Sequence, residues 1–147
     1  MKVFLATDHA GFEFKEKIKT FLQTKDYDVE DCGAFELNPN DDYPDLIAPA
    51  AEKVAGDPGS FGIVLGKSGA GECIVANKIK GIRAVLGVSE QNVRLAREHN
   101  DANILSLGSE IVDEQIAKCL IELFLNTPFS NEERHVRRIE KIKNLEN

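Results

Sequence analysis

Short apolar runs alternate with amphipathic stretches along the whole chain. The apolar runs predict strands, the second less apolar than the others, at 3–6, 27–30, 61–65, 82–86 and 103–107. Apolar residues at helical spacing between and after them predict helices at 12–22, 44–55, 72–78, 89–98, 113–125 and 131–145. Strands separated by helices form right-handed βαβ units. The pattern therefore predicts an α/β fold around a parallel sheet with both faces covered.

Ligands of such sheets bind beyond the carboxyl ends of the strands, near the point where strand order reverses. Asp8-His9 follows the first predicted strand, and a glycine-rich loop, 66–71, follows the third. Both are therefore candidates for one site. His99-Asn100 precedes the fifth strand, which puts it at the opposite edge. It can reach such a site only if a second subunit delivers it.

The glycine-rich loop reads Gly66-Lys67-Ser68-Gly69-Ala70-Gly71 and ends at Glu72. It is not a P-loop, because Phe61 stands where the first glycine is needed, and its glycine spacing is not GxGxxG. It is either an ordinary tight turn or a nest of backbone N–H groups for a phosphate or an enolate oxygen. Glu72, in turn, is either a carboxylate stabilised by the helix dipole or a general base beside that nest.

A chain of 147 residues fits one domain, 1–147, and its formal charge of −7 gives no support for binding nucleic acid or an anionic membrane. Basic residues nevertheless gather near the end of the chain: Arg134, His135, Arg137, Arg138, Lys141 and Lys143. This cluster is either a site for a small anion or a solvated helix face paired with nearby glutamates. Arg134 and Arg138 are four residues apart, so on a helix they share one face and can converge on a phosphate.

The three cysteines form no CxxC pair, and no group of His, Cys and carboxylate residues has metal-ligand spacing. We therefore expect reduced thiols, a cytoplasmic protein and no metal. No apolar run approaches the ~20 residues of a membrane span. His9 and His99 lie in polar contexts, where each is either a packed side chain or a group that moves a proton near neutrality. Asp8 is either a helix cap or part of the site.

Several motifs occur in order along nearly the whole chain. They are Asp8-His9-Ala10-Gly11, the loop through Glu72, Ala76-Asn77-Lys78, Gly81-Ile82-Arg83-Ala84, Arg97-Glu98-His99-Asn100-Asp101 and Arg134-His135. With these motifs the sequence resembles type B ribose-5-phosphate isomerases and the related galactose-6-phosphate isomerase subunits. The resemblance implies a Rossmann-like three-layer α/β/α sandwich with a five-stranded parallel sheet. It also implies a homodimer or homotetramer with active sites at the subunit interface, where helix 131–145 would pack.

The implied activity is interconversion of D-ribose 5-phosphate and D-ribulose 5-phosphate in the pentose phosphate pathway, without a cofactor. One branch of the family has a cysteine at the position of Gly66 as its base, whereas the other uses a glutamate at the position of Glu72. This chain matches the glutamate branch. The resemblance implies His99 and Asp8 for ring opening, Ser68 with the backbone of 67–71 for the enediolate, and Tyr43 and Asn100 for the sugar. It implies His9, Arg134 and Arg138 for the phosphate. The loop residues of the implied substrate site are Gly66, Lys67, Gly69, Ala70 and Gly71.

Two positions depart from the family pattern. Glu110 stands where an arginine commonly helps to bind phosphate, and Lys67 replaces a usual glycine. Glu110 must turn away, pair with a cation or signal a changed substrate, and Lys67 would restore the missing charge. The alternatives are therefore an isomerase of galactose 6-phosphate, allose 6-phosphate or a non-phosphorylated sugar. An alternative of another class is a non-catalytic phosphate-binding module.

Overall fold

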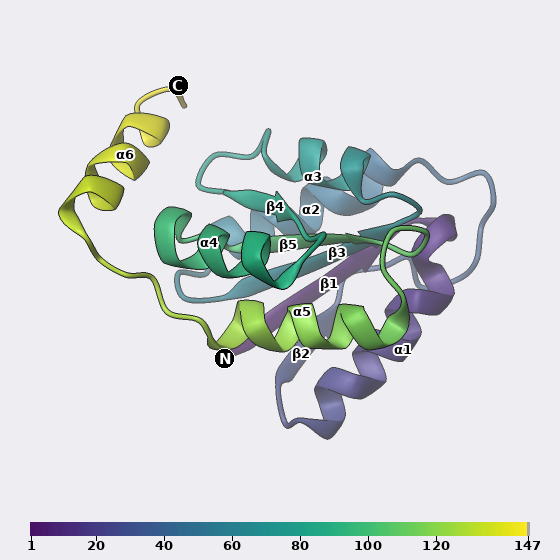
Figure 1. Cartoon of the computed structure of the whole chain (residues 1–147). Helices are drawn as coiled ribbons and strands as arrows, with labels where there is room; N and C mark the ends of the chain where they lie inside the picture. Colours follow the sequence, from purple (N-terminus) through teal and green to yellow (C-terminus); the bar gives the residue numbers. More distant parts are fainter. Residues whose placement is uncertain (147) are drawn as a thin grey trace.

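The computed structural model describes residues 1–146 and contains one parallel sheet (Figure 1). Its strands are β1 (Lys2–Thr7), β2 (Asp28–Asp31), β3 (Phe61–Gly66), β4 (Ala84–Leu86) and β5 (Ile104–Gly108), in the order β2-β1-β3-β5-β4. The helices are α1 (Phe12–Thr24), α2 (Tyr43–Ala55), α3 (Ala70–Ala76), α4 (Glu90–Asn100), α5 (Glu114–Asn126) and α6 (Glu133–Lys143). A short 3₁₀ turn, η1 (His9–Gly11), joins β1 to α1. The expected α/β sandwich with a five-stranded parallel sheet is confirmed.

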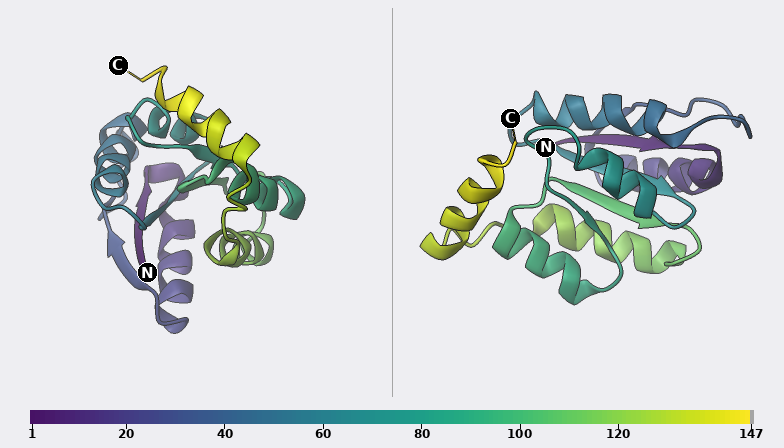
Figure 2. Two further views of the ribbon diagram at one scale, coloured as in Figure 1. Left: turned by 90° about the vertical axis from the view of Figure 1, so that its left-hand side faces the viewer. Right: turned by 90° about the horizontal axis from the view of Figure 1, so that it is seen from above.

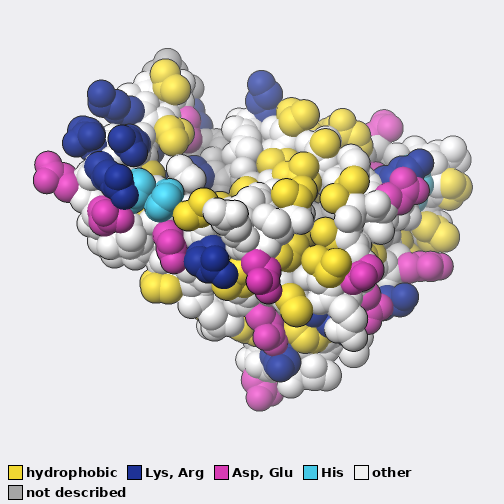
Figure 3. Space-filling view, in the orientation of Figure 1, with side chains coloured by type: hydrophobic (Ala, Val, Ile, Leu, Met, Phe, Trp, Pro, Cys, Tyr) yellow, Lys and Arg dark blue, Asp and Glu magenta, His cyan; other side chains and the backbone are white. Residues whose placement is uncertain are grey.

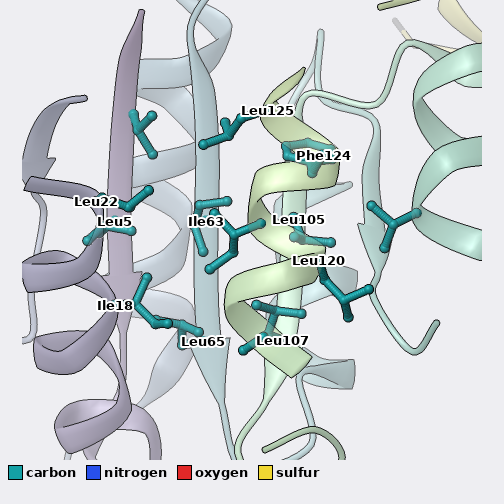
Figure 4. Close-up of a cluster of buried hydrophobic side chains, with 14 of the residues drawn as sticks. Leu5, Ile18, Leu22, Ile63, Leu65, Leu105, Leu107, Leu120, Phe124 and Leu125 are labelled. Carbon is teal, nitrogen blue, oxygen red and sulfur yellow. The ribbon is translucent and has the colours of Figure 1, made fainter. Parts of the chain in front are cut away.

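Helices cover both faces of the sheet, as parallel strands require (Figure 2). On one face, α1, α4 and α5 pack their apolar sides onto the strands, and Figure 4 shows Ile18, Leu120 and Phe124 meeting Leu5, Ile63 and Leu105. On the other face, α2 and α3 cover a smaller cluster around Ile47, Val64 and Ile104. The central strands are buried on both sides. Their sequences are therefore continuous apolar runs rather than alternating ones.

The strand order reverses between β1 and β3. From β1 the chain goes outward to β2 on one side and then crosses to β3 on the other. The register aligns Thr7 with Leu65 and Gly66 with Gly108, so the carboxyl ends of β1, β3 and β5 lie at the same level. This is the position where open α/β sheets bind ligands.

Some boundaries differ from those predicted. The fourth strand begins at Ala84 instead of Ile82, because a turn at Gly81 (φ +86°) places Ile82 in the core before the strand starts. Helix α3 begins two residues earlier than expected. Helix α6 is shorter at both ends than the predicted 131–145, and it stands off from the sheet beside α4 (Figures 1 and 2). Across residues 1–146, every helix is too short or too polar to span a bilayer.

Candidate active site

The loop after β3 is fixed by its contacts with the loop after β5. The backbone N–H of Ser109 donates to the carbonyl of Gly66 (2.9 Å), and that of Glu110 donates to the carbonyl of Lys67 (3.0 Å). Gly69 caps α3 with φ +80°, and a Cβ there would lie 2.9 Å from the carbonyl carbon of Leu107. Gly69 is therefore required both by its backbone conformation and by the close approach of β5. The resulting loop is rigid and presents its backbone outward.

Backbone N–H groups of this loop are available to a ligand. Within residues 1–146, the amides of Lys67, Ser68 and Gly69 donate no hydrogen bond, and the amide of Ala70 donates only to Ser68 Oγ (3.2 Å). Lys67, Ser68 and Ala70 are exposed. The predicted nest is therefore present as a cluster of free donors at the start of α3, where the helix dipole favours negative charge.

Glu72 lies in the first turn of α3 with a side chain that is almost fully buried, at 4% exposure. Its carboxylate occupies the space above Gly66, since a Cβ built on Gly66 would overlap both carboxylate oxygens. Burial raises the pKa of Glu72, its own backbone N–H lowers that pKa by donating to the carboxylate, and the charge of Asp8 raises it. A buried carboxylate with a raised pKa beside free amide donors has the properties of a general base.

Asp8 is held at the end of β1 by the turn that follows it. One carboxylate oxygen accepts from the N–H groups of Ala10 (3.0 Å) and Gly11 (3.3 Å), so Asp8 is the cap of η1. Gly11 in turn abuts β3, because a Cβ on it would come within 3.1 Å of the backbone nitrogen of Gly66. Asp8 therefore caps the turn, one of the two roles expected of it, and it lies close enough to Glu72 to raise the pKa of that carboxylate.

His9 and Tyr43 lie at the same edge. His9 Nδ1 is 2.6 Å from Asp41 Oδ1, and the ring is about one-third exposed. The phenol of Tyr43, at the start of α2, packs on Gly71, where an added Cβ would lie 2.8 Å from the hydroxyl oxygen. The structure therefore brings Asp8, His9, Tyr43 and the loop through Glu72 together.

The other predicted residues form a second cluster. The ring of His99 stacks on that of His135 at 4.2 Å and 16°. Burial lowers the pKa of His135, as does the nearby charge of Arg138 on α6. Basic side chains gather over α6, beside histidine (Figure 3). Asn100, at the end of α4, accepts a hydrogen bond from Arg83 Nε through its carbonyl (2.8 Å).

These two clusters are at opposite edges of the sheet. His99 precedes β5, whereas Glu72 follows the carboxyl end of β3, and a strand of five residues is about 13 Å long. One copy of the chain therefore does not bring His99, Asn100, Arg134 and Arg138 to Glu72.

The two residues that depart from the family pattern face each other. Lys67 Nζ lies 3.9 Å from Glu110 Oε1, and both side chains are well exposed. Of the outcomes expected for Glu110, the structure shows pairing with a cation. Such an exposed pair contributes about 0–1 kcal/mol, so its effect is on local charge rather than on stability.

A buried carboxylate next to unbonded amides, at the switch point of a parallel α/β sheet, is the arrangement that an enzyme moving a proton next to a carbonyl requires. The sequence comparisons identify which of these enzymes it resembles. The Ribose/Galactose Isomerase family matches residues 3–142, and the chain belongs to this family.

Individual relatives match over nearly their whole length. Ribose-5-phosphate isomerase B of Mycobacterium tuberculosis (strain H37Rv) is 42% identical over 99% of this chain and 90% of its own. The crystal structure of ribose-5-phosphate isomerase B from Mycoplasma genitalium with bound ribulose-5-phosphate is 40% identical, with a TM-score of 0.94 over 99% of this chain and 95% of that one. A ribose 5-phosphate isomerase from Thermotoga maritima is 41% identical, with a TM-score of 0.92 over 97% of both chains.

Two residues of these clusters had no role assigned from the sequence. Asp41 is one of two adjacent aspartates in a polar loop, and the pattern does not distinguish it from Asp42. His135 appears in the sequence only within a basic run and the Arg134-His135 motif, neither of which assigns it a role. Its burial beneath His99 follows from the way α6 meets α4, which local spacing does not reveal.

Proposed function

We propose that this protein interconverts D-ribose 5-phosphate and D-ribulose 5-phosphate, with Glu72 as the base that carries a proton between C2 and C1. The observation that carries the proposal is the buried Glu72 carboxylate beside the free amides of 67–69. Family membership supports the expected aldose–ketose isomerase. An acceptor for the carbon-bound proton and donors for the enediolate oxygen are the two groups that this reaction needs.

The chemistry follows from the arrangement at the carboxyl edge. After the sugar ring opens, Glu72 removes the proton from C2, and the electron pair moves onto the carbonyl oxygen to form a cis-enediolate. The loop amides and Ser68 stabilise that oxygen. The proton of the C2 hydroxyl then passes to the C1 oxygen, and Glu72 returns its proton to C1 as the C2 carbonyl forms. Asp8, at the end of β1, assists ring opening together with His99. Tyr43 and Asn100 contact the sugar.

His99 takes part only if a second copy of the chain supplies it, and we therefore propose a homodimer or a larger homo-oligomer with shared sites. Helix α6 supports this proposal. It has 11 residues, stands off from the sheet and exposes Val136 and Ile142, and Leu145, just after the helix, is exposed as well. A helix this short is marginal unless it packs against other elements. In the assembly, Arg134 and Arg138 of α6 would meet the substrate phosphate opposite His9.

The remaining expectations fit this proposal. We propose a single catalytic domain whose α6 packs at the subunit interface, acting in the cytoplasm, where free thiols persist. Cys32, Cys73 and Cys119 are all free. The reaction needs no cofactor in this scheme, so exhaustive treatment with a chelator is expected to leave the rate unchanged.

The test of the base compares ribose 5-phosphate turnover by the parent and by Glu72→Gln, which should lose about 10²–10⁴-fold in kcat. Glu90→Gln is the matched control, because Glu90 is an exposed glutamate in the first turn of another helix. Retention of most activity by Glu72→Gln would rule out the base. A panel of hexose 6-phosphates and non-phosphorylated sugars identifies the preferred substrate. Binding without turnover in the parent would instead indicate a phosphate-binding module.

The shared site has its own test. Glu72→Gln and His99→Asn should each be inactive alone. After the two are mixed and allowed to exchange subunits, half of the dimers carry one intact site, so about a quarter of the parent activity should return. No recovery despite verified exchange would show that His99 serves a site in its own chain.

A further inference from the structure

The imidazole of His9 is held by a carboxylate from a distant part of the chain. Asp41, in the loop between β2 and α2, places Oδ1 2.6 Å from His9 Nδ1. The same oxygen accepts the backbone N–H of His9 at 3.1 Å. Asp41 Oδ2 is buried and has no hydrogen-bond partner within residues 1–146. His9 is therefore the residue with which the Asp41 carboxylate forms its hydrogen bonds.

This contact fixes which ring nitrogen carries a proton. Because a carboxylate only accepts, Nδ1 must be the donor in the 2.6 Å bond. A neutral ring would then present Nε2 as an acceptor, which cannot bind a phosphate oxygen. A doubly protonated ring presents Nε2–H as a donor and carries a positive charge. Only the imidazolium form is thus suited to an anion.

The groups around the ring favour that form. The hydrogen bond that His9 donates to Asp41 raises the pKa of His9, burial lowers it, and the charges of Asp8 and Asp41 raise it further. Asp8 faces the ring from the end of β1, and Asp41 faces it from the loop before α2. Asp8, His9 and Asp41 also place ligand-type atoms within 4.8 Å of one another, but His9 Nδ1 and Asp41 Oδ1 are already bonded to each other.

We propose that Asp41 is a positioning residue that holds His9 as an imidazolium and directs its Nε2–H at the phosphate of the substrate. This inference rests on the proposed function, which assigns the phosphate to His9. Asp41 does not touch substrate in this scheme and acts entirely through His9.

The first test follows the His9 ring directly. In Asp41→Asn, NMR titration of the His9 imidazole should show a lower midpoint than in the parent, because the carboxylate that stabilises its charge is gone. Calorimetry with inorganic phosphate should show weaker binding near pH 8, by about tenfold. Asp42→Asn is the matched control, because Asp42 is the adjacent exposed aspartate and its side chain makes no hydrogen bond with His9. An unchanged His9 midpoint in Asp41→Asn would overturn the proposal.

The second test uses kinetics. Asp41→Asn should raise KM for ribose 5-phosphate about tenfold near pH 8, while kcat stays within about threefold, because ground-state and transition-state binding of the phosphate weaken together. The ratio of the two KM values should approach one as the pH is lowered, because His9 then becomes charged in both proteins. Substrate ionisation cancels in this ratio. A ratio that does not change with pH would contradict the charge-holding role.

A double-mutant cycle separates positioning from a general structural role. In a His9→Gln background, Asp41→Asn should change KM by less than about twofold, since its effect passes through the missing ring. Equal effects of Asp41→Asn in both backgrounds would overturn the proposal, as would an effect that tracks only a fall in melting temperature. If the parent fails to turn over ribose 5-phosphate, the proposed function fails, while the His9 titration and phosphate calorimetry still decide the role of Asp41.

Discussion

Replacing Gly66 by alanine tests whether the geometry of the base, and not merely its presence, supports catalysis. The added methyl group would overlap the Glu72 carboxylate, with 2.8 Å to Oε2 as the longest of its three contacts with that group. Strand β3 cannot easily move, because it pairs with β1 on one side and β5 on the other. The carboxylate must therefore rotate away from its position above the strand.

The magnitude follows from how far the carboxylate has to move. Ordinary van der Waals contact begins near 3.4 Å, so relieving the overlap displaces the reactive oxygen by more than about 1 Å. A displacement of this size costs roughly 10²-fold in rate, or about 2.7 kcal/mol. We expect kcat to fall by about that factor while KM changes little, because the phosphate contacts lie on other residues. Overpacking costs about 1–3 kcal/mol of stability, which leaves a domain of ordinary stability folded.

The assay is initial-rate conversion of ribose 5-phosphate to ribulose 5-phosphate, with melting temperature measured on the same preparations. Gly56→Ala is the control, because Gly56 follows α2 at φ −83° and its added Cβ makes only ordinary contacts, with the carbonyl oxygens of Glu52 (3.4 Å) and Lys53 (3.8 Å). This control should retain parental kcat. The reasoning is refuted if Gly66→Ala remains folded and retains more than about a third of the parental kcat.

Three further predictions concern the surroundings of the base. Burial is the main cause of the raised pKa of Glu72, and the Asp8 charge adds to it. Asp8→Asn should therefore move the acid limb of the kcat–pH profile to lower pH, because more acid is then needed before the carboxylate protonates. Glu110→Gln should release Lys67 from its ion pair and lower KM for the sugar phosphate about two- to fivefold at low salt. This decrease in KM should vanish near 0.5 M salt if the effect is electrostatic. His135→Ala should lower kcat about tenfold, because it releases the stacked His99 ring. His135→Phe keeps a flat ring and should retain most activity. Equal losses in both variants would contradict a role for stacking.

The sequence predicted the layers of the fold because they depend on local periodicity. Apolar runs such as 61–65 and the helical repeats between them correspond to β3 and its neighbouring helices within a residue or two. The glycine-rich loop after β3 was one of two alternatives, a tight turn or a nest, because a glycine such as Gly69 allows a backbone conformation that other residues disfavour in either case.

What the sequence did not predict depends on contacts between distant segments. The hydrogen bond between His9 and Asp41 joins residues 32 positions apart, and the loop that makes it has no periodicity. The stack of His135 on His99 depends on how α6 leaves the body of the protein. In both cases the element types were predictable, but the partner of each side chain was not. Strand order, likewise, is a property of the assembled sheet.

The contact between Gly66 and Glu72 gives a physical reason for the two kinds of base expected in this family. Any side chain at position 66 begins with a Cβ that lies inside the volume of the Glu72 carboxylate. A cysteine there and a glutamate at 72 in its present orientation would compete for one place beside the same loop amides. The site therefore has room for one base, supplied either from the end of the strand or from the first turn of the helix. In the proposed mechanism, the absence of a side chain at position 66 is therefore as necessary as the presence of the carboxylate at position 72.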